Sequence, residues 1–123
     1  PAYCVATGKA LLAWREQSTT DLLTARPLHA FTPSTLSDTS ALALELERVR
    51  QRGYAVNRGE WRASVWGIAA PVFDGSRRAV AAIGISGPAA RIRARGVKVL
   101  GQRVMQAADQ ASALRTGHLA LST

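Results

Sequence analysis

Two short stretches of the chain approach motifs that bind or transform substrates, and each lacks a required residue. The stretch A-T-G-K-A-L-L-A at 6–13 contains the Gly-Lys pair of a phosphate-binding loop. That loop needs a glycine where Tyr3 stands, and a serine or threonine at Ala10, directly after the lysine. The stretch G-I-S-G-P at 84–88 lacks the last glycine of the G-x-S-x-G turn that presents a nucleophilic serine. We therefore predict neither a phosphate loop nor a serine hydrolase.

The remaining candidates for catalysis or metal binding are His29, His118 and Cys4. Both histidines fall in segments that we predict as a loop and a tail, and no acidic residue is placed to orient either of them toward Ser86. Two histidines and one cysteine at unrelated spacings do not form a metal site, and a single cysteine allows no internal disulfide. We therefore expect that the protein is not an enzyme and holds no metal or cofactor.

The composition is that of a single globular domain. The chain has 123 residues, of which 47% are hydrophobic and 20% are charged. It contains no apolar run of the ~18 residues that a membrane span needs, and no signal peptide. Its single cysteine suits a reducing compartment. We therefore expect a cytoplasmic protein that makes no membrane contact.

The net charge of +8 raises the question of nucleic-acid binding. The tightest basic runs are R-V-R-Q-R at 48–52 and R-I-R-A-R at 91–95. No aromatic residue interleaves with either run, as a stacking surface for bases would require. The first run falls in the last turns of a predicted helix, where the helix dipole favours cations. The charge therefore indicates a solvated, arginine-rich surface, and direct nucleic-acid binding by this segment is the alternative.

The spacing of apolar residues predicts both helices and strands. The clearest helix carries Leu42, Leu46 and Val49 on one face and stops at Gly53. The predicted helices span 8–25, 37–52 and 94–114, and the predicted strands span 54–57, 62–74 and 79–86. Breakers mark the ends of these elements: a cap at Thr19 or Thr20 and a stop at Pro27, a turn at Asp74-Gly75, and stops at Gly87-Pro88 and Gly117.

The predicted sheet is thin, because one hairpin and a short third strand must support three helices. We therefore expect further strands upstream of Pro1 in a parent protein, or an edge supplied by a partner chain. The chain starts with proline and not methionine, so we interpret it as an N-terminally truncated fragment.

The two faces of the predicted hairpin differ in side-chain volume. Because successive strand residues point to opposite faces, Trp66 falls on one face, whereas Gly67 and Ala69 fall on the other. In the next strand, Gly84 and Ser86 fall on the face of small residues. Glycines in a strand often mark a close approach by a ligand or another backbone. This hollow face therefore either receives a closely packed helix or forms the floor of a pocket.

Five blocks of sequence have an order and spacing that together cover nearly the whole chain. The blocks are A-T-G-K-A-L-L-A at 6–13, T-P-S-T-L at 32–36, L-E-R-V-R-Q-R-G-Y-A-V at 46–56, I-A-A-P-V-F-D at 68–74 and A-A-I-G-I-S-G-P at 81–88. Together they resemble the effector-binding domain of IclR-type bacterial transcriptional regulators. The resemblance implies a GAF-like fold of the α/β (α+β) class, an antiparallel sheet flanked by helices. Residues 1–123 would then form one partial domain that lacks its first strands.

The resemblance also implies a function, which is regulation of transcription in response to a small organic acid. DNA would be bound only through an absent N-terminal winged helix-turn-helix domain, and ligand binding would change the arrangement of subunits in a homodimer or tetramer. The alternative is an oligomerisation module whose pocket is vestigial and has no effector.

The family's ligand position implies a set of site residues in this chain. The matching positions are Ala6, Thr7, Asn57, Gly67, Gly84 and Ser86. Trp61 is either a lid over the pocket or a half-buried surface aromatic residue, and Trp66 faces away as a core or oligomer contact. The backbone N–H groups near Gly8, at a helix N-terminus, would suit a carboxylate.

Three of these positions depart from the family pattern. Asn57 stands where the family often has an acidic residue, Gly67 where it has a cysteine or polar residue, and Gly84 where it has a serine. Each departure removes charge or bulk from the expected pocket. We therefore expect a larger and less polar pocket, anchored by a few polar groups, that takes an aromatic or longer-chain acid.

Overall fold

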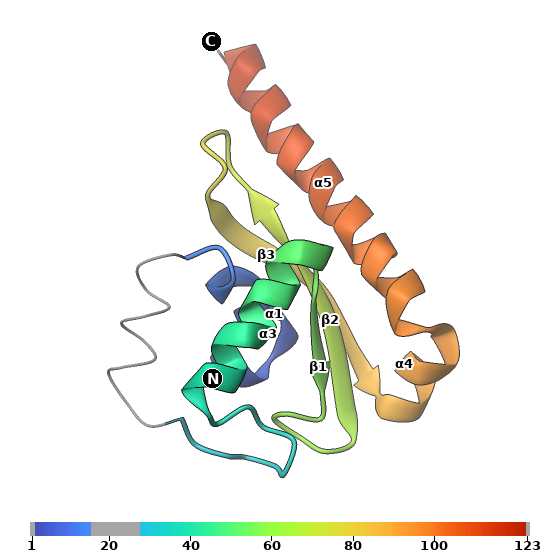
Figure 1. The fold of residues 1–123 in the computed structure, drawn as a ribbon. Helices are drawn as coiled ribbons and strands as arrows, with labels where there is room; N and C mark the ends of the chain where they lie inside the picture. Colours follow the sequence, from blue (N-terminus) through green and yellow to red (C-terminus); the bar gives the residue numbers. More distant parts are fainter. Residues whose placement is uncertain (1, 16–27, 123) are drawn as a thin grey trace.

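The computed structural model describes residues 2–15 and 28–122, and for residues 115–122 it describes the backbone alone. The elements in chain order are η1 (Ala2–Cys4), α1 (Ala6–Leu12), α3 (Thr39–Arg52), β1 (Ala55–Arg58), β2 (Val65–Phe73), β3 (Ala79–Pro88), α4 (Ala89–Arg95) and α5 (Val97–Ser122) (Figure 1). The expected mixed α/β class and antiparallel sheet are confirmed. No helix in the described part of the chain is both long enough and apolar enough to cross a membrane.

The strands form one antiparallel sheet in the order β1-β2-β3, with β2 in the centre. Asn57 of β1 lies opposite Gly67 of β2, and Gly67 in turn lies opposite Ser86 of β3. The register therefore places three residues of the predicted site in one row across the sheet.

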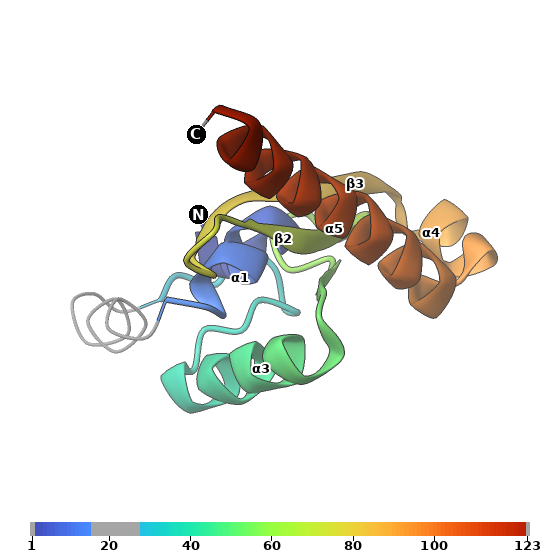
Figure 2. The same cartoon turned by 90° about the horizontal axis from the view of Figure 1, so that it is seen from above.

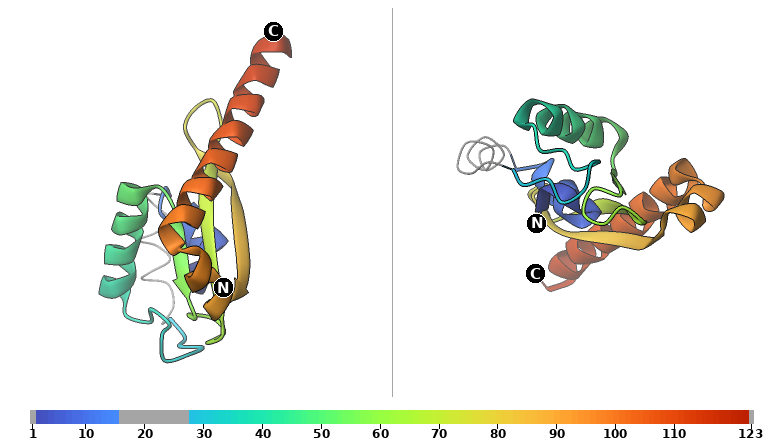
Figure 3. Two further views of the ribbon diagram at one scale, coloured as in Figure 1. Left: turned by 90° about the vertical axis from the view of Figure 1, so that its right-hand side faces the viewer. Right: turned by 90° about the horizontal axis from the view of Figure 1, so that it is seen from below.

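The sheet separates two layers of helices (Figures 2 and 3). Helices α1 and α3 lie on one side, and α5 crosses the other side and extends beyond the end of the sheet (Figure 1). Each side has its own apolar core. The core on the α1 side contains Tyr3, Cys4, Ala6, Ala10, Leu12, Ala13, Leu42, Leu46, Val49, Ala55 and Ala69. The core on the α5 side contains Val56, Ile68, Ala70, Val72, Ile92, Leu100, Val104 and Ala108.

Helix α3 forms as its sequence predicts. Asp38 caps its start by accepting a hydrogen bond from the backbone N–H of Ser40. Gly53 ends it in the left-handed conformation, with φ of 92°, and donates its N–H to the carbonyl of Val49. The basic residues of its last turn, Arg50 and Arg52, pair with acidic residues of the same helix. This basic run therefore belongs to the helix end, as the sequence indicates.

The first helix begins earlier than predicted. It starts at Ala6, so Gly8 lies inside α1 and does not open it. A Cβ on Gly8 would come within 2.3 Å of the carbonyl oxygen of Ala2, so glycine is needed there to let η1 fold back against α1. The predicted cap at Thr19 or Thr20 and the stop at Pro27 lie outside the described residues.

The C-terminal third also differs from its prediction. Strand β3 continues through Gly87-Pro88, and a short helix, α4, follows it that the sequence analysis missed. The last helix then starts at Val97 and passes through Gly117, because one glycine costs a helix interior only about 1 kcal/mol and does not stop it alone. Leu114, at the end of the predicted helix, is 74% exposed, since α5 extends beyond the sheet at that point (Figure 1).

Candidate functional site

A cavity of about 310 Å³ lies on the α1 side of the sheet. The start of α1, the loop between β1 and β2, and one end of all three strands form its walls. Its lining residues are Val5, Ala6, Thr7, Asn57, Trp61, Val65, Trp66, Gly67, Ile68, Gly84, Ile85 and Ser86. The structure therefore brings all six predicted site residues, and Trp61, to one cavity.

The hollow face of the sheet receives the first turn of α1. A Cβ on Gly84 would lie 3.0 Å from both the Cβ of Ala69 and the carbonyl oxygen of Ile68, and 3.1 Å from the Cγ2 of Thr7. A Cβ on Gly67 would lie 3.3 Å from the Cβ of Ala6. Both glycines therefore adjoin α1 and both line the cavity, so the hollow face receives the helix and also forms part of the pocket floor.

Asn57 is held by hydrogen bonds on both sides of its amide group. Its Nδ2 donates to the carbonyl of Cys4 at 3.0 Å, and its Oδ1 accepts from the backbone N–H of Glu60 at 2.7 Å. Because a carbonyl can only accept and an N–H can only donate, these two neighbours fix which end of the amide is oxygen. The second N–H of the amide therefore stays available as a donor.

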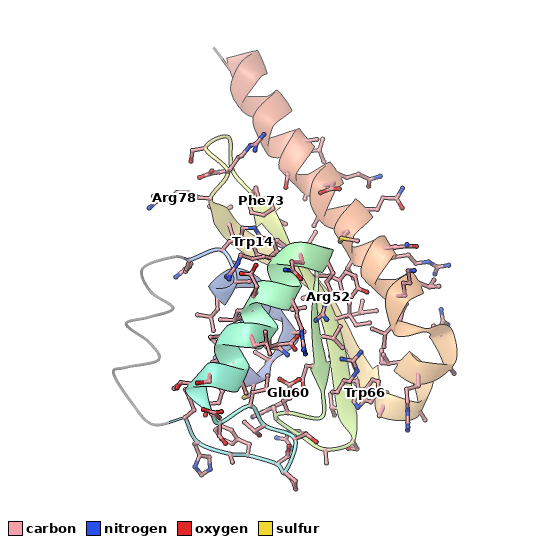
Figure 4. All side chains as sticks on the ribbon, in the orientation of Figure 1. Trp14, Arg52, Glu60, Trp66, Phe73 and Arg78 are labelled. Carbon is pink, nitrogen blue, oxygen red and sulfur yellow. The ribbon has the colours of Figure 1, made fainter. Side chains whose placement is uncertain are left out.

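A buried ion pair lies beside Asn57, and the sequence analysis did not find it. The side chain of Lys9 is 0% exposed and that of Glu60 is 8% exposed. The Nζ of Lys9 lies 2.9 Å from Oε1 and 3.0 Å from Oε2 of Glu60, and it also donates to the carbonyl of Val56. The backbone N–H of Arg58 donates to Oε2 at 3.1 Å. Glu60 is labelled in Figure 4.

The loop between β1 and β2 is also tied to the segment before α3. The hydroxyl of Thr35 donates to the carbonyl of Glu60, while it accepts from the backbone N–H groups of Phe31 and Thr32 at 3.0 and 2.9 Å. The hydroxyl of Thr32 donates to the carbonyl of Gly59 at 2.6 Å. The wall of the cavity therefore depends on residues from three separate parts of the chain.

The two tryptophans near the cavity have different surroundings. Trp61 is 39% exposed, and the guanidinium of Arg62 lies 4.4 Å from its ring centre. Trp66 packs against the core on the α5 side, between the guanidinium groups of Arg58 at 5.7 Å and Arg93 at 5.3 Å (Figure 4). Trp66 is thus a core contact on the far face, which is one of the two roles expected for it.

The electrostatics of the cavity are set by neutral groups. None of the described residues that line it is charged. Burial raises the pKa of the neighbouring Cys4 thiol, which disfavours the reactive thiolate. No three His, Cys, Asp or Glu side chains come together as a metal site within the described ranges 2–15 and 28–114.

The chain matches a known family along most of its length. The family described as "Bacterial transcriptional regulator IclR C-terminal" matches residues 1–113. The transcriptional repressor IclR of Escherichia coli K12 is 38% identical over 111 residues, which cover 89% of this chain and 40% of the relative. This chain spans 34–40% of the length of three curated regulators that it matches.

Two solved structures are similar in fold. The C-terminal domain of the E. coli transcriptional regulator KdgR has a TM-score of 0.84 and 32% identity, with 94% of this chain and 71% of that chain covered. The inducer-binding domain of the Acinetobacter transcription factor PobR, a double mutant in complex with 3-hydroxybenzoic acid, has a TM-score of 0.80 and 25% identity. That alignment covers 94% of this chain and 65% of that chain. The chain therefore belongs to the IclR family of bacterial transcriptional regulators, as its C-terminal domain.

Proposed function

We propose that this domain binds a small organic acid, and an aromatic one in particular, in the cavity beside α1. The proposal rests on the polar groups that line this cavity and have hydrogen-bonding capacity left unused within the described part of the chain. Asn57 lines the cavity, and its fixed amide keeps one N–H that bonds no other described residue. The hydroxyls of Thr7 and Ser86 also line the cavity and make no hydrogen bond within the described part of the chain. A carboxylate accepts hydrogen bonds only, so it suits this set of donors.

The remaining lining supports an apolar body on the ligand. Val5, Val65 and the exposed ring of Trp61 supply apolar wall, and a cavity of about 310 Å³ lies at the lower end of the range typical of small-ligand sites. The 3-hydroxybenzoic acid bound by the double mutant of PobR, a structural relative, is an acid of this class. The first turn of α1 also faces the cavity, and N–H groups at a helix start favour anions.

In the parent regulator, we propose that the acid changes DNA binding by a separate helix-turn-helix domain. The acid would do so by stabilising one arrangement of the domains in a homodimer or tetramer. Gel-shift measurements on the complete regulator, with and without the acid, test this step. Light scattering gives the oligomeric state in both conditions.

The proposal is tested by a thermal-shift screen followed by calorimetry. The panel contains 3-hydroxybenzoate, benzoate and pyruvate, with 3-hydroxybenzyl alcohol as a matched compound that lacks the carboxylate. A ligand at about 100 times its Kd stabilises the folded protein by about 2.7 kcal/mol, which is a clear rise in melting temperature. We expect the aromatic acids to raise it and the alcohol to leave it unchanged. If every acid leaves it unchanged while the protein self-associates, the oligomerisation module with a vestigial pocket is the correct reading.

A further inference from the structure

The buried pair formed by Lys9 and Glu60 lies directly behind the wall of the cavity. Neither residue lines the cavity, but each is bonded to a residue that does. The backbone N–H of Lys9 donates to the carbonyl of Val5, and that of Glu60 donates to Asn57. Lys9 belongs to α1, which carries Ala6 and Thr7 to the cavity. Glu60 precedes Trp61 in the chain. The pair therefore joins α1 to the loop between β1 and β2, two of the segments that line the site.

Glu60 connects more of the site than any other described residue. Its backbone N–H holds the Oδ1 of Asn57, its carbonyl accepts from Thr35, and its carboxylate binds Lys9 and the N–H of Arg58. Asn57 is held on its other side by the carbonyl of Cys4. A shift of Glu60 would thus rotate the amide of Asn57 and move Trp61 together.

A buried ion pair adds little net stability to the contact between these elements. Taking two charges out of water costs several kcal/mol each, and apolar residues of similar volume often replace a buried pair without loss of stability. What apolar residues cannot supply is direction, since the carboxylate must sit where the ammonium and the N–H of Arg58 both point at it. The geometry of the pair therefore suggests a role in placement.

We propose that Lys9 and Glu60 are positioning residues of the ligand site. Their ion pair fixes the amide of Asn57 and the ring of Trp61 in the arrangement that receives the ligand, and neither of them touches it. The ligand part of this proposal rests on the proposed function, whereas the placement of Trp61 is a property of the unliganded protein.

The test uses the double variant Lys9→Met/Glu60→Gln, which removes both charges and leaves no unpaired buried ion. The matched control is Arg50→Met/Glu47→Gln, which removes the exposed pair of α3. Each protein is labelled with 5-fluorotryptophan, which gives one ¹⁹F resonance for each of the three tryptophans. The variant Trp61→Phe identifies the resonance of Trp61. Calorimetry with 3-hydroxybenzoate measures affinity on the same proteins.

We expect the double variant to melt within about 5 °C of the native protein, because a buried pair can be replaced as a unit. The ¹⁹F chemical shift of its Trp61 should move toward the value of the protein unfolded in urea. The Kd for 3-hydroxybenzoate should rise at least about tenfold. The control should change neither quantity. A double variant with a native Trp61 resonance would overturn the proposal, because the pair would then be structural only.

One further variant tests the proposal if the double variant does not fold, and the fluorine comparison tests it if the protein binds no acid. If the double variant does not fold, Glu60→Asp retains the charge but shortens the side chain, and the same shift of the Trp61 resonance is expected. A folded Glu60→Asp protein with native resonance and affinity would also overturn the proposal. If the native protein binds no acid, the proposed function fails, and the fluorine comparison still decides the role of the pair.

Discussion

Replacing Gly84 by alanine should destabilise the domain, because the added methyl has no room. Its carbon would lie 3.0 Å from the Cβ of Ala69 and from the carbonyl oxygen of Ile68, and 3.1 Å from Thr7 on α1. Two of these atoms belong to the neighbouring strand β2, so β2 and β3 must shift apart locally and α1 must also give way. Overpacking of this kind costs about 1–3 kcal/mol, and the lower backbone entropy of unfolded alanine returns roughly 0.5–1 kcal/mol.

We therefore expect the free energy of unfolding to fall by about 1.5 kcal/mol, and the melting temperature by about 6 °C. Urea unfolding followed by circular dichroism measures the change, and an unaltered slope with urea would show that the two end states are unchanged. Gly75→Ala is the matched control, because no atom lies within 4 Å of the position of its Cβ. It should stay within about 0.5 kcal/mol of the native protein.

Gly67→Ala should fall between the two, since its nearest contacts are 3.3 Å to Ala6 and 3.4 Å to Ile85. The order of stabilities, with Gly84→Ala lowest, tests the close packing of β2 and α1 around this glycine. If Gly84→Ala were as stable as Gly75→Ala, that packing would be wrong, and the glycine would serve the open cavity instead.

Three further predictions follow from other features. Gly67→Val should place a side chain in the cavity and raise the Kd for 3-hydroxybenzoate at least about tenfold by calorimetry, whereas Gly75→Val should not. Gly53→Ala should cost roughly 1 kcal/mol in urea unfolding, because alanine disfavours the φ of 92° at the end of α3; an unchanged stability would contradict that conformation. Asp74 accepts hydrogen bonds from the N–H of Arg78 and the hydroxyl of Ser76, which lower the pKa of its carboxyl group. Its stabilisation is therefore present above about pH 4 and is lost as the pH falls through its lowered folded-state pKa. Asp74→Asn should remove this part of the pH dependence of urea unfolding, and an identical acid profile would refute it.

The parts of the fold that follow local rules were predictable from the sequence. The face of Leu42, Leu46 and Val49 and the stop at Gly53 define α3 by residues within one helix, and all four behave as expected. The alternation along β2 likewise placed Gly67 on the face opposite Trp66, because the side-chain period of a strand is two. The resemblance to the family then selected six residues that the structure brings to one cavity.

The rest of the site depends on contacts between distant residues. Lys9 and Glu60 are 51 positions apart, and they meet only because the loop after β1 folds over α1. The sequence shows Lys9 beside a glycine, which suggested a phosphate loop, and gives Glu60 no visible partner. Gly117 was misread for a related reason, since whether one glycine ends a helix depends on the surrounding structure, and α5 continues through it.

Helix α5 has the proportions of a lever arm. Its 26 residues span about 39 Å at about 1.5 Å per residue. At Ser112 the helix accepts a hydrogen bond from the N–H of Phe73 in β2, and it continues for ten more residues to Ser122. The arm starts beside Gly96, whose φ of 92° separates it from α4. A tilt of about 10° at that junction would carry the far end about 7 Å and Ser112 about 4 Å, so α5 can pivot there only if the sheet packed against it moves as well.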